Sequence, residues 1–245
     1  MLFTYGCARE LPTYEPAELP VSLVMQQLAQ RQNHLVSYRA VGTIRVQGGK
    51  KRWSGRAFLL SRFPNSLRLE VVSMFGHPVL YAASDGGQFL VWEPGRNRAY
   101  QGSASGGTLA HIIEFPLQDQ EALLILAGTV PSWQDGDPKV FRVRGTENLM
   151  LQLDGVDGRL TQRVWLEDEG LVVTKIERTR DGERELEARF SDFVDIEGFY
   201  YPRSVVMEGA KARLTLRYQQ FVNNENIDES VFHLALPDGV EIVPW

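Results

Sequence analysis

The hydrophobic pattern of the chain changes its period near residue 37. Between Val21 and Val36, apolar residues recur at helical spacing while glutamine and arginine fill the other face, which predicts an amphipathic helix. Pro20 stands where such a helix would begin. From Tyr38 onward, apolar and polar residues alternate, as in a half-buried β-strand. We therefore expect a helix that leads directly into antiparallel strands.

Short turn signals divide the alternating region into hairpins. The clearest in the first half are Pro64-Asn65-Ser66 and Asp85-Gly86-Gly87. A Gly/Ser stretch from Gly102 to Gly107 ends this meander. Two short helical patterns follow, Leu109–Glu114 and Asp119–Ala127, and Gly128 stands in the C-cap position of the second.

Strand patterning resumes at Lys139 and continues in hairpins to Val222, and no linker inside residues 21–245 separates two cores. A single sheet of this size must curl or close, because large flat sheets are rare. We expect a mainly β fold with helices, in which one antiparallel sheet of about 11–13 strands curls into a half-barrel. The N-terminal helix and the mid-chain helical insert would close it. Residues 1–20 are expected to form an extended, proline-containing tether, and residues 21–245 the half-barrel domain.

The composition is that of a globular protein without a basic surface. Apolar residues make up 43% of the chain and charged residues 23%, and the formal net charge is -5. This balance argues against a nucleic-acid partner. The longest apolar run, Ala122 to Ala127, is far shorter than the ~18 residues that a membrane-spanning helix requires. We expect a monomer that binds no nucleic acid.

The single cysteine, Cys7, excludes an internal disulfide framework. Its setting, Gly6-Cys7-Ala8, is typical of a bacterial lipoprotein signal, which ends in a small residue before the cysteine that becomes lipidated. The preceding stretch from Met1 to Tyr5 is too short for the apolar region of about 7–15 residues in a secretory signal. Two interpretations stay open: a lipidated Cys7 that anchors the protein to a membrane, or a free thiol in a disordered tail.

Residues with catalytic potential are scattered along the sequence. The histidines, which lack the spacing of a metal site, are His34, His77, His111 and His233. Asp192, Asp195 and Glu197 could form a carboxylate pair for hydrolysis, but such residues are more often the polar end of a strand before a turn such as Gly198. We therefore predict no catalytic residue, no metal and no cofactor.

Four segments carry a family resemblance. They are the helix that runs into Tyr38-Arg39-Ala40-Val41-Gly42, the pair Leu67 to Gly76 and Leu80 to Gly86, the stretch Phe190 to Arg203, and the closing Phe232 to Val240. In order and spacing they resemble the LolA/LolB-like proteins, which handle lipoproteins and lipids in the bacterial periplasm. The resemblance covers nearly the whole chain after residue 20, although each segment is a strand-and-turn signature with no invariant chemistry.

The resemblance implies a non-enzymatic half-barrel with a helical lid that binds acyl chains in its hollow. It implies a lipoprotein on the periplasmic face of the outer membrane if Cys7 is lipidated, and a soluble periplasmic carrier if it is not. Ala8 would fit outer-membrane sorting, which Asp at that position usually blocks. Met74 and Phe75 fall at the turn that corresponds to a membrane-contacting loop of LolB-like proteins. The alternative is a phenyl ring folded back onto its own hairpin.

Acyl-chain binding would use the apolar face of the strands. The candidate lining residues are Ile44, Val46, Ala57, Leu59, Leu69, Val71, Ala188, Phe190, Leu214 and Leu216. An alternative function is a periplasmic sensor or envelope-assembly module that binds a protein partner through an apolar patch outside the hollow. An enzyme acting on lipid or glycan would instead need His, Asp and Glu side chains converging in the hollow.

Overall fold

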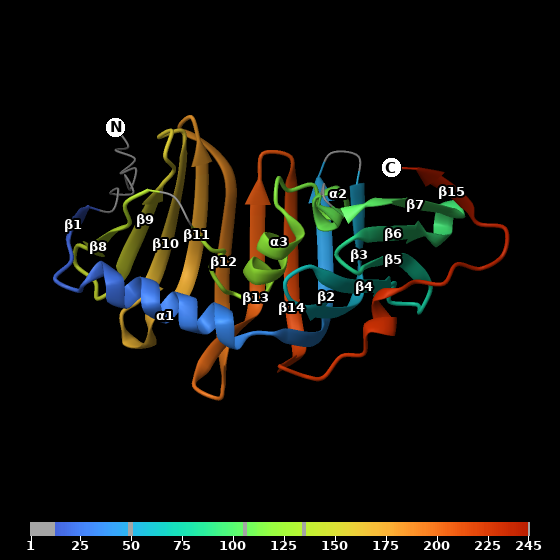
Figure 1. Ribbon diagram of the computed structural model, residues 1–245, viewed down its shortest axis with the longest axis horizontal. Helices are drawn as coiled ribbons and strands as arrows, with labels where there is room; N and C mark the ends of the chain where they lie inside the picture. The colour runs from blue at the N-terminus through green and yellow to red at the C-terminus, as the bar shows by residue number, and fades with distance from the viewer. Residues whose placement is uncertain (1–12, 49–50, 105–106, 134–135, 245) are drawn as a thin grey trace, which may run out of the picture.

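A single curved sheet runs through the whole molecule. The computed structural model describes residues 13–48, 51–104, 107–133 and 136–244. In this part of the chain the strands form one 15-stranded sheet with helices on one of its faces (Figure 1). The edge strands β1 (Tyr14–Pro16) and β15 (Glu241–Pro244) lie at opposite ends, so the sheet is open (Figure 1). The expected half-barrel architecture is confirmed.

Two meanders make up most of the sheet. The first contains β2 (Ser37–Gly48), β3 (Lys51–Arg62), β4 (Ser66–Val72), β5 (Pro78–Ser84), β6 (Gln88–Glu93) and β7 (Arg98–Ser103). The second contains β8 (Lys139–Val143), β9 (Leu149–Asp154), β10 (Leu160–Glu167), β11 (Val172–Arg180), β12 (Glu183–Ile196), β13 (Phe199–Gly209) and β14 (Ala212–Asn223). The strand order is β1-β8-β9-β10-β11-β12-β13-β14-β2-β3-β4-β5-β6-β7-β15.

The edge strands explain why the sheet exceeds the expected strand number. β1 lies within the segment expected to be a tether, and it pairs antiparallel with β8 through Glu15 and Arg142. β15 pairs with β7, and this is a parallel pairing in an otherwise antiparallel sheet. Each edge strand is too short to show alternation in the sequence, so the hydrophobic pattern could not reveal it.

The two meanders join where β14 pairs with β2. Leu214 lies opposite Val46, and Leu216 lies opposite Ile44. The backbones approach closely at Gly42, where a Cβ atom would lie 2.2 Å from the carbonyl oxygen of Arg217. This seam lies near the middle of the sheet and brings residues from both halves of the sequence onto one inner face.

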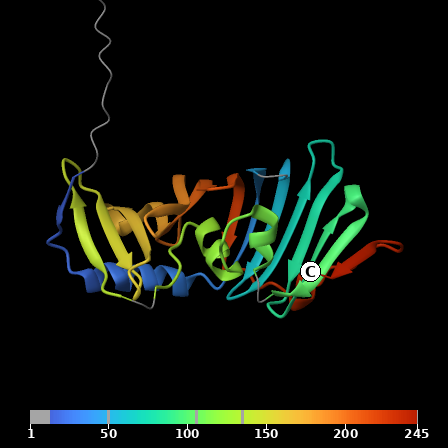
Figure 2. The same ribbon diagram turned by 90° about the horizontal axis from the view of Figure 1, so that it is seen from above.

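The helices all lie on the concave side (Figures 1 and 2). Helix α1 (Val21–His34) crosses the second meander and buries Val24 and Leu28. The guanidinium of Arg31 fixes this helix to the sheet by donating a hydrogen bond to the carbonyl oxygen of Tyr200. Helices α2 (Thr108–Ile113) and α3 (Asp119–Leu126) cover the middle of the sheet. The core is thus one apolar layer between helices and sheet.

Three short 3-10 helices complete the described structure: η1 (Pro94–Arg96), η3 (Glu169–Leu171) and η4 (Glu229–Phe232).

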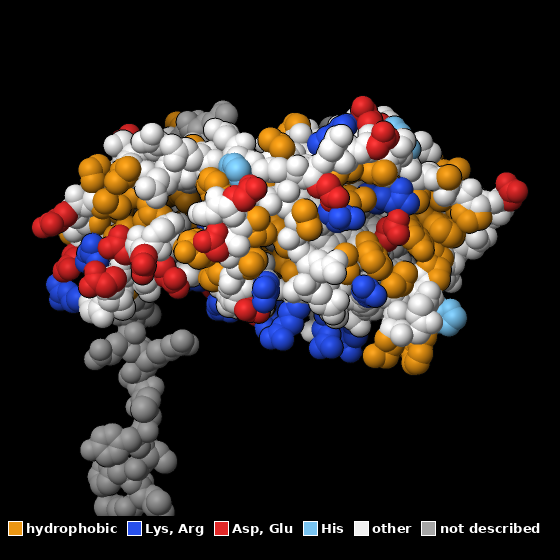
Figure 3. All heavy atoms as spheres, turned by 90° about the horizontal axis from the view of Figure 1, so that it is seen from below, with side chains coloured by type: hydrophobic (Ala, Val, Ile, Leu, Met, Phe, Trp, Pro, Cys, Tyr) orange, Lys and Arg blue, Asp and Glu red, His pale blue; other side chains and the backbone are white. Residues whose placement is uncertain are grey.

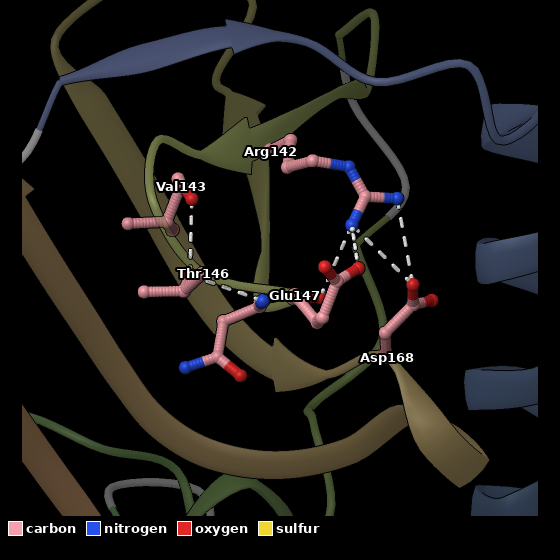
Figure 4. A network of polar contacts seen from close by, with 6 residues as sticks. Arg142, Val143, Thr146, Glu147 and Asp168 are labelled. Atoms are coloured by element: carbon pink, nitrogen blue, oxygen red, sulfur yellow. Dashed lines mark hydrogen bonds and ion pairs between the residues drawn. The ribbon is translucent and has the colours of Figure 1, made fainter.

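Polar contacts hold the outer end of the second meander (Figure 4). Nη1 of Arg142 donates to the Glu147 carboxylate at 2.9 Å, and Nη2 lies 3.4 Å from Oδ2 of Asp168. Thr146 closes the β8–β9 turn by donating from its hydroxyl to the carbonyl oxygen of Val143 at 3.0 Å. Arg142 therefore ties the β8–β9 turn to the connection between β10 and β11.

Candidate functional site

Helices α2 and α3 form a compact lid over the sheet seam. Asp119 joins them, because its Oδ1 accepts a buried hydrogen bond from the Leu109 N–H at 2.7 Å. At the start of α3, Gln118 and Glu121 form a reciprocal capping box. The helix ends before Gly128, which has a φ of 71° and packs against the ring of Pro202. Local sequence signals therefore define both ends of α3.

Two tyrosines of the sheet hold the lid by hydrogen bonds to its backbone. The hydroxyl of Tyr38 donates to the carbonyl oxygen of Leu123 at 3.2 Å, and that of Tyr218 donates to Leu126 at 3.0 Å. Burial raises the pKa of both phenols well above the ordinary value, because the charged form would lose its hydration. Both side chains therefore remain neutral hydrogen-bond donors under the lid.

An apolar hollow lies between the lid and the seam. Its lining comprises Ala40, Gly42, Ile44, Ala57, Leu59, Leu69, Leu109, Ile113, Leu126, Leu214, Leu216 and Tyr218. The free space is about 10 Å³, no more than the room for a single water molecule. The lid contributes Leu109, Ile113 and Leu126 to the wall of this small space. In this conformation the hollow is closed and filled by the protein itself.

The structure brings together part of the predicted lining. Around the hollow lie Ile44, Ala57, Leu59, Leu69, Leu214 and Leu216. Val46, Val71, Ala188 and Phe190 belong to the same buried core but not to the wall of the hollow. The sequence prediction omitted the lid side chains, because strand alternation gives no information about which residues of a short helix face the sheet. Ligand binding by the lining residues remains a prediction.

Met74 and Phe75 lie at the tip of the β4–β5 turn and are among the most exposed apolar residues described, 88% and 80% accessible. Gly76, with a φ of 81°, and the hydrogen bond from the His77 N–H to Oγ of Ser73 shape this turn. The hairpin extends away from the helices (Figure 2), and apolar side chains project at this end of the molecule (Figure 3). The phenyl ring is not folded back onto its hairpin.

Three of the polar residues considered for catalysis, Asp195, His34 and Glu197, make local structural contacts. Asp195 accepts a hydrogen bond from the Gly198 N–H at 2.8 Å and so shapes the β12–β13 turn. The His34 ring stacks on Phe199 with centroids 4.2 Å apart, and its Nε2 lies 3.6 Å from Glu197. Among the described residues, no group of three or more His, Cys, Asp or Glu side chains could hold a metal ion. Cys7 lies outside the described residues.

The comparison with solved structures identifies the architecture. No protein-family model matches the sequence, and no curated protein does. A LolA superfamily protein from Nitrosomonas europaea matches over 88% of this chain and 98% of its own, with a TM-score of 0.56 and 14% identity. This chain has the LolA fold. A putative outer membrane lipoprotein-sorting protein domain from Vibrio parahaemolyticus matches over 87% of this chain and 97% of its own, with a TM-score of 0.55 and 11% identity.

A third similar structure is a DUF1329 family protein from Desulfovibrio piger, with a TM-score of 0.56 and 11% identity over 87% of this chain and 97% of its own. None of these three is described as an enzyme. Among the described residues of this LolA-like chain, no helix combines the length and the apolar character needed to cross a bilayer.

Proposed function

We propose that the protein binds the acyl chains of a lipid or lipoprotein in the hollow between the sheet and the α2–α3 lid. It would carry them to the bacterial outer membrane or insert them there. The main support is the lining of the hollow, which is apolar and roofed by only three side chains from two short helices. The similarity in fold to a putative outer membrane lipoprotein-sorting domain from Vibrio parahaemolyticus also supports this proposal.

Binding would require the lid to move, because the hollow is filled when it is closed. An acyl chain would take the place of Leu109, Ile113 and Leu126 against the sheet. Each methylene that leaves water contributes about 0.8 kcal/mol, so one long chain offsets the loss of the lid contacts and of the two tyrosine hydrogen bonds. In this proposal the described conformation is the closed, empty state.

A pair of leucine variants in α3 tests the hollow. Leu126 lines it, whereas Leu124 is equally buried on the same helix but lies outside it. Each substitution by alanine should destabilise the fold by about 2–5 kcal/mol. Only Leu126→Ala opens space for a ligand, so it alone should tighten binding of a fluorescent fatty acid, by several-fold, as measured by titration. Failure of the wild type and of both variants to bind the probe would refute the proposal.

The Met74-Phe75 turn extends the proposal to the membrane. Two exposed apolar side chains at a turn tip can enter a lipid interface and hold a carrier at the bilayer. Cys7, if lipidated, would hold the protein at the periplasmic face of the outer membrane, whereas an unlipidated protein would be a soluble periplasmic carrier. In this proposal, the Met74-Phe75 turn and the lipid on Cys7 would both contact the membrane, and the membrane would receive the bound acyl chains.

A protein-binding role is a second candidate. Tyr81 and Trp92 stack with ring centroids 5.3 Å apart on the strand face opposite the buried residues Ala82 and Val91. Half-buried aromatic pairs of this kind are common in protein interfaces. A sensor or envelope-assembly module would use this outer face, and stable co-purification of a partner that depends on Trp92 would favour that role over lipid transport.

A further inference from the structure

A buried polar pair interrupts the apolar inner face of the second meander. Gln162 on β10 and Arg178 on β11 are cross-strand partners, and they are 0% and 7% exposed. Their neighbours on the same face, Val164 and Ile176, are fully buried. A guanidinium in such a setting is costly unless its donors are satisfied, so its position calls for a partner.

The donors of this pair are only partly satisfied. Nη2 of Arg178 donates to Oε1 of Glu121 at 2.7 Å and to Oε1 of Gln162 at 3.1 Å. Nε of Arg178 and Nε2 of Gln162 are buried and have no hydrogen-bond partner among the residues that the structure describes. The same is true of Nε1 of Trp133. All three unpartnered atoms are donors, so the site has more buried donors than acceptors, and the oxygens of a carboxylate or a phosphate would suit it.

A groove lies beside Glu121, the hydrogen-bond partner of Arg178. It measures about 610 Å³, and its walls include Glu121, Trp133 and Arg180. Glu121 stands between the groove and Arg178, and its side chain is 29% exposed whereas that of Arg178 is 8% exposed. The carboxylate of Glu121 is thus the acceptor now nearest to the buried guanidinium, and a ligand anion arriving through the groove would compete with it.

Helix α3 connects the groove to the hollow. Glu121 lies in its first turn, and Leu126, which roofs the hollow, is its last residue. These positions are about 7–8 Å apart along the helix axis. Arg178 on β11 is three strand spacings from β14, or about 14 Å, which is within the length of a long acyl chain. One amphiphile could therefore reach both places.

We propose that Arg178 and Gln162 bind the anionic group of an amphiphile, a carboxylate or a phosphate, whose acyl chain lies in the hollow. The anion displaces Glu121 from Arg178, which frees the first turn of α3 and couples head-group binding to lid opening. The proposal rests on the proposed function for its apolar part and adds the class of ligand: anionic lipids or fatty acids in preference to neutral ones.

The test compares ligands that differ in the head group. Oleate and oleyl alcohol are titrated into the full-length protein against a neutral fluorescent acyl probe. The second pair is the anionic dioleoylphosphatidylglycerol and the zwitterionic dioleoylphosphatidylcholine. Preference for the anionic member of this pair indicates a phosphate site, whereas preference for oleate in the first pair indicates a carboxylate site. Arg178→Met is compared with Arg163→Met, whose guanidinium lies on the opposite face of β10 near Glu177. Glu121→Gln, at a partly exposed position, provides a variant that should fold even if Arg178→Met does not.

The wild type should bind the anionic member of at least one pair more tightly. Arg178→Met should lower that affinity by about tenfold and leave the neutral ligand unchanged, because only charge-assisted hydrogen bonds are lost. Glu121→Gln should raise the affinity for the anion, and Arg163→Met should change neither.

The anion site would be overturned if the wild type bound anionic and neutral ligands equally well. It would also be overturned if Arg178→Met lost affinity for both ligands equally. Either result would leave acyl-chain binding intact. No binding of either ligand class would instead overturn the proposed function itself.

Discussion

At the scale of single residues, a glycine allows the backbones of β2 and β14 to lie close together at the centre of the sheet. Gly42 on β2 faces the backbone of β14, and it also lines the hollow. Any Cβ at this position would overlap the carbonyl oxygen of Arg217. Because the clash is with backbone and not with a flexible side chain, the strands themselves would have to separate.

We expect Gly42→Ala to destabilise the protein by about 1–3 kcal/mol, because overpacking moves the backbone at the seam. Chemical denaturation measures this change. Gly95→Ala is the matched control, since nothing lies within 4 Å of a Cβ at Gly95, and it should alter stability by less than about 0.5 kcal/mol. Equal effects of the two substitutions would show that the seam tolerates a side chain.

The strand-side residues of the candidate site could be predicted, because alternation alone places Ile44, Leu59 and Leu216 on the buried face. The lid-side residues could not, since their place depends on how short helices dock onto the sheet. The pairing of Gln162 with Arg178 depends on the register of the β10–β11 hairpin, which contains an irregularity between Trp165 and Leu166. No periodic pattern in the sequence encodes that register.

At the scale of elements, strong local signals gave accurate boundaries. The helix expected over Val21–Val36 ends at His34 in the structure, and the one expected over Asp119–Ala127 ends at Leu126. Pro20 marks the start of the first helix and Gly128 the end of the second. The edge strands β1 and β15 were missed because their pairing is decided by distant partners and not by their own composition.

The β4–β5 turn carries a prediction of its own. Phe75→Asp should weaken binding to vesicles of phosphatidylethanolamine and phosphatidylglycerol by about tenfold or more, because burial of a phenyl ring contributes about 1.5–3 kcal/mol. Flotation or sedimentation with vesicles measures the bound fraction. Val156→Asp is the control, since Val156 is 82% exposed in the β9–β10 turn. If both variants bind like the wild type, the turn does not contact lipid.

At the scale of the whole molecule, the half-barrel could be predicted because so large a sheet must curve, whereas the closed state of the hollow could not. How far the lid side chains fill the space depends on the packing of α2 and α3 against both meanders at once. Gly42 on β2 and Ala57 on β3 are small residues at the hollow, but Leu109, Ile113 and Leu126 face them from the lid.

The proposed lipid anchor at Cys7 can be tested in a bacterial cell. If Cys7 is lipidated, the wild-type protein should incorporate labelled palmitate and fractionate with the outer membrane. Cys7→Ser should abolish the label and release the protein into the soluble periplasmic fraction. An unlabelled wild-type protein would favour the free thiol and the soluble carrier.

The seam between β14 and β2 also determines when, during synthesis, the hollow is completed. β2 leaves the ribosome early, but its partner β14 is among the last strands to be made. Leu214 and Leu216 supply one wall of the hollow from that late strand. A growing chain can fold its first hairpins from local contacts, yet it has no complete pocket until residues 212–223 have paired. Unfinished molecules therefore lack the complete hollow in which we propose that acyl chains bind.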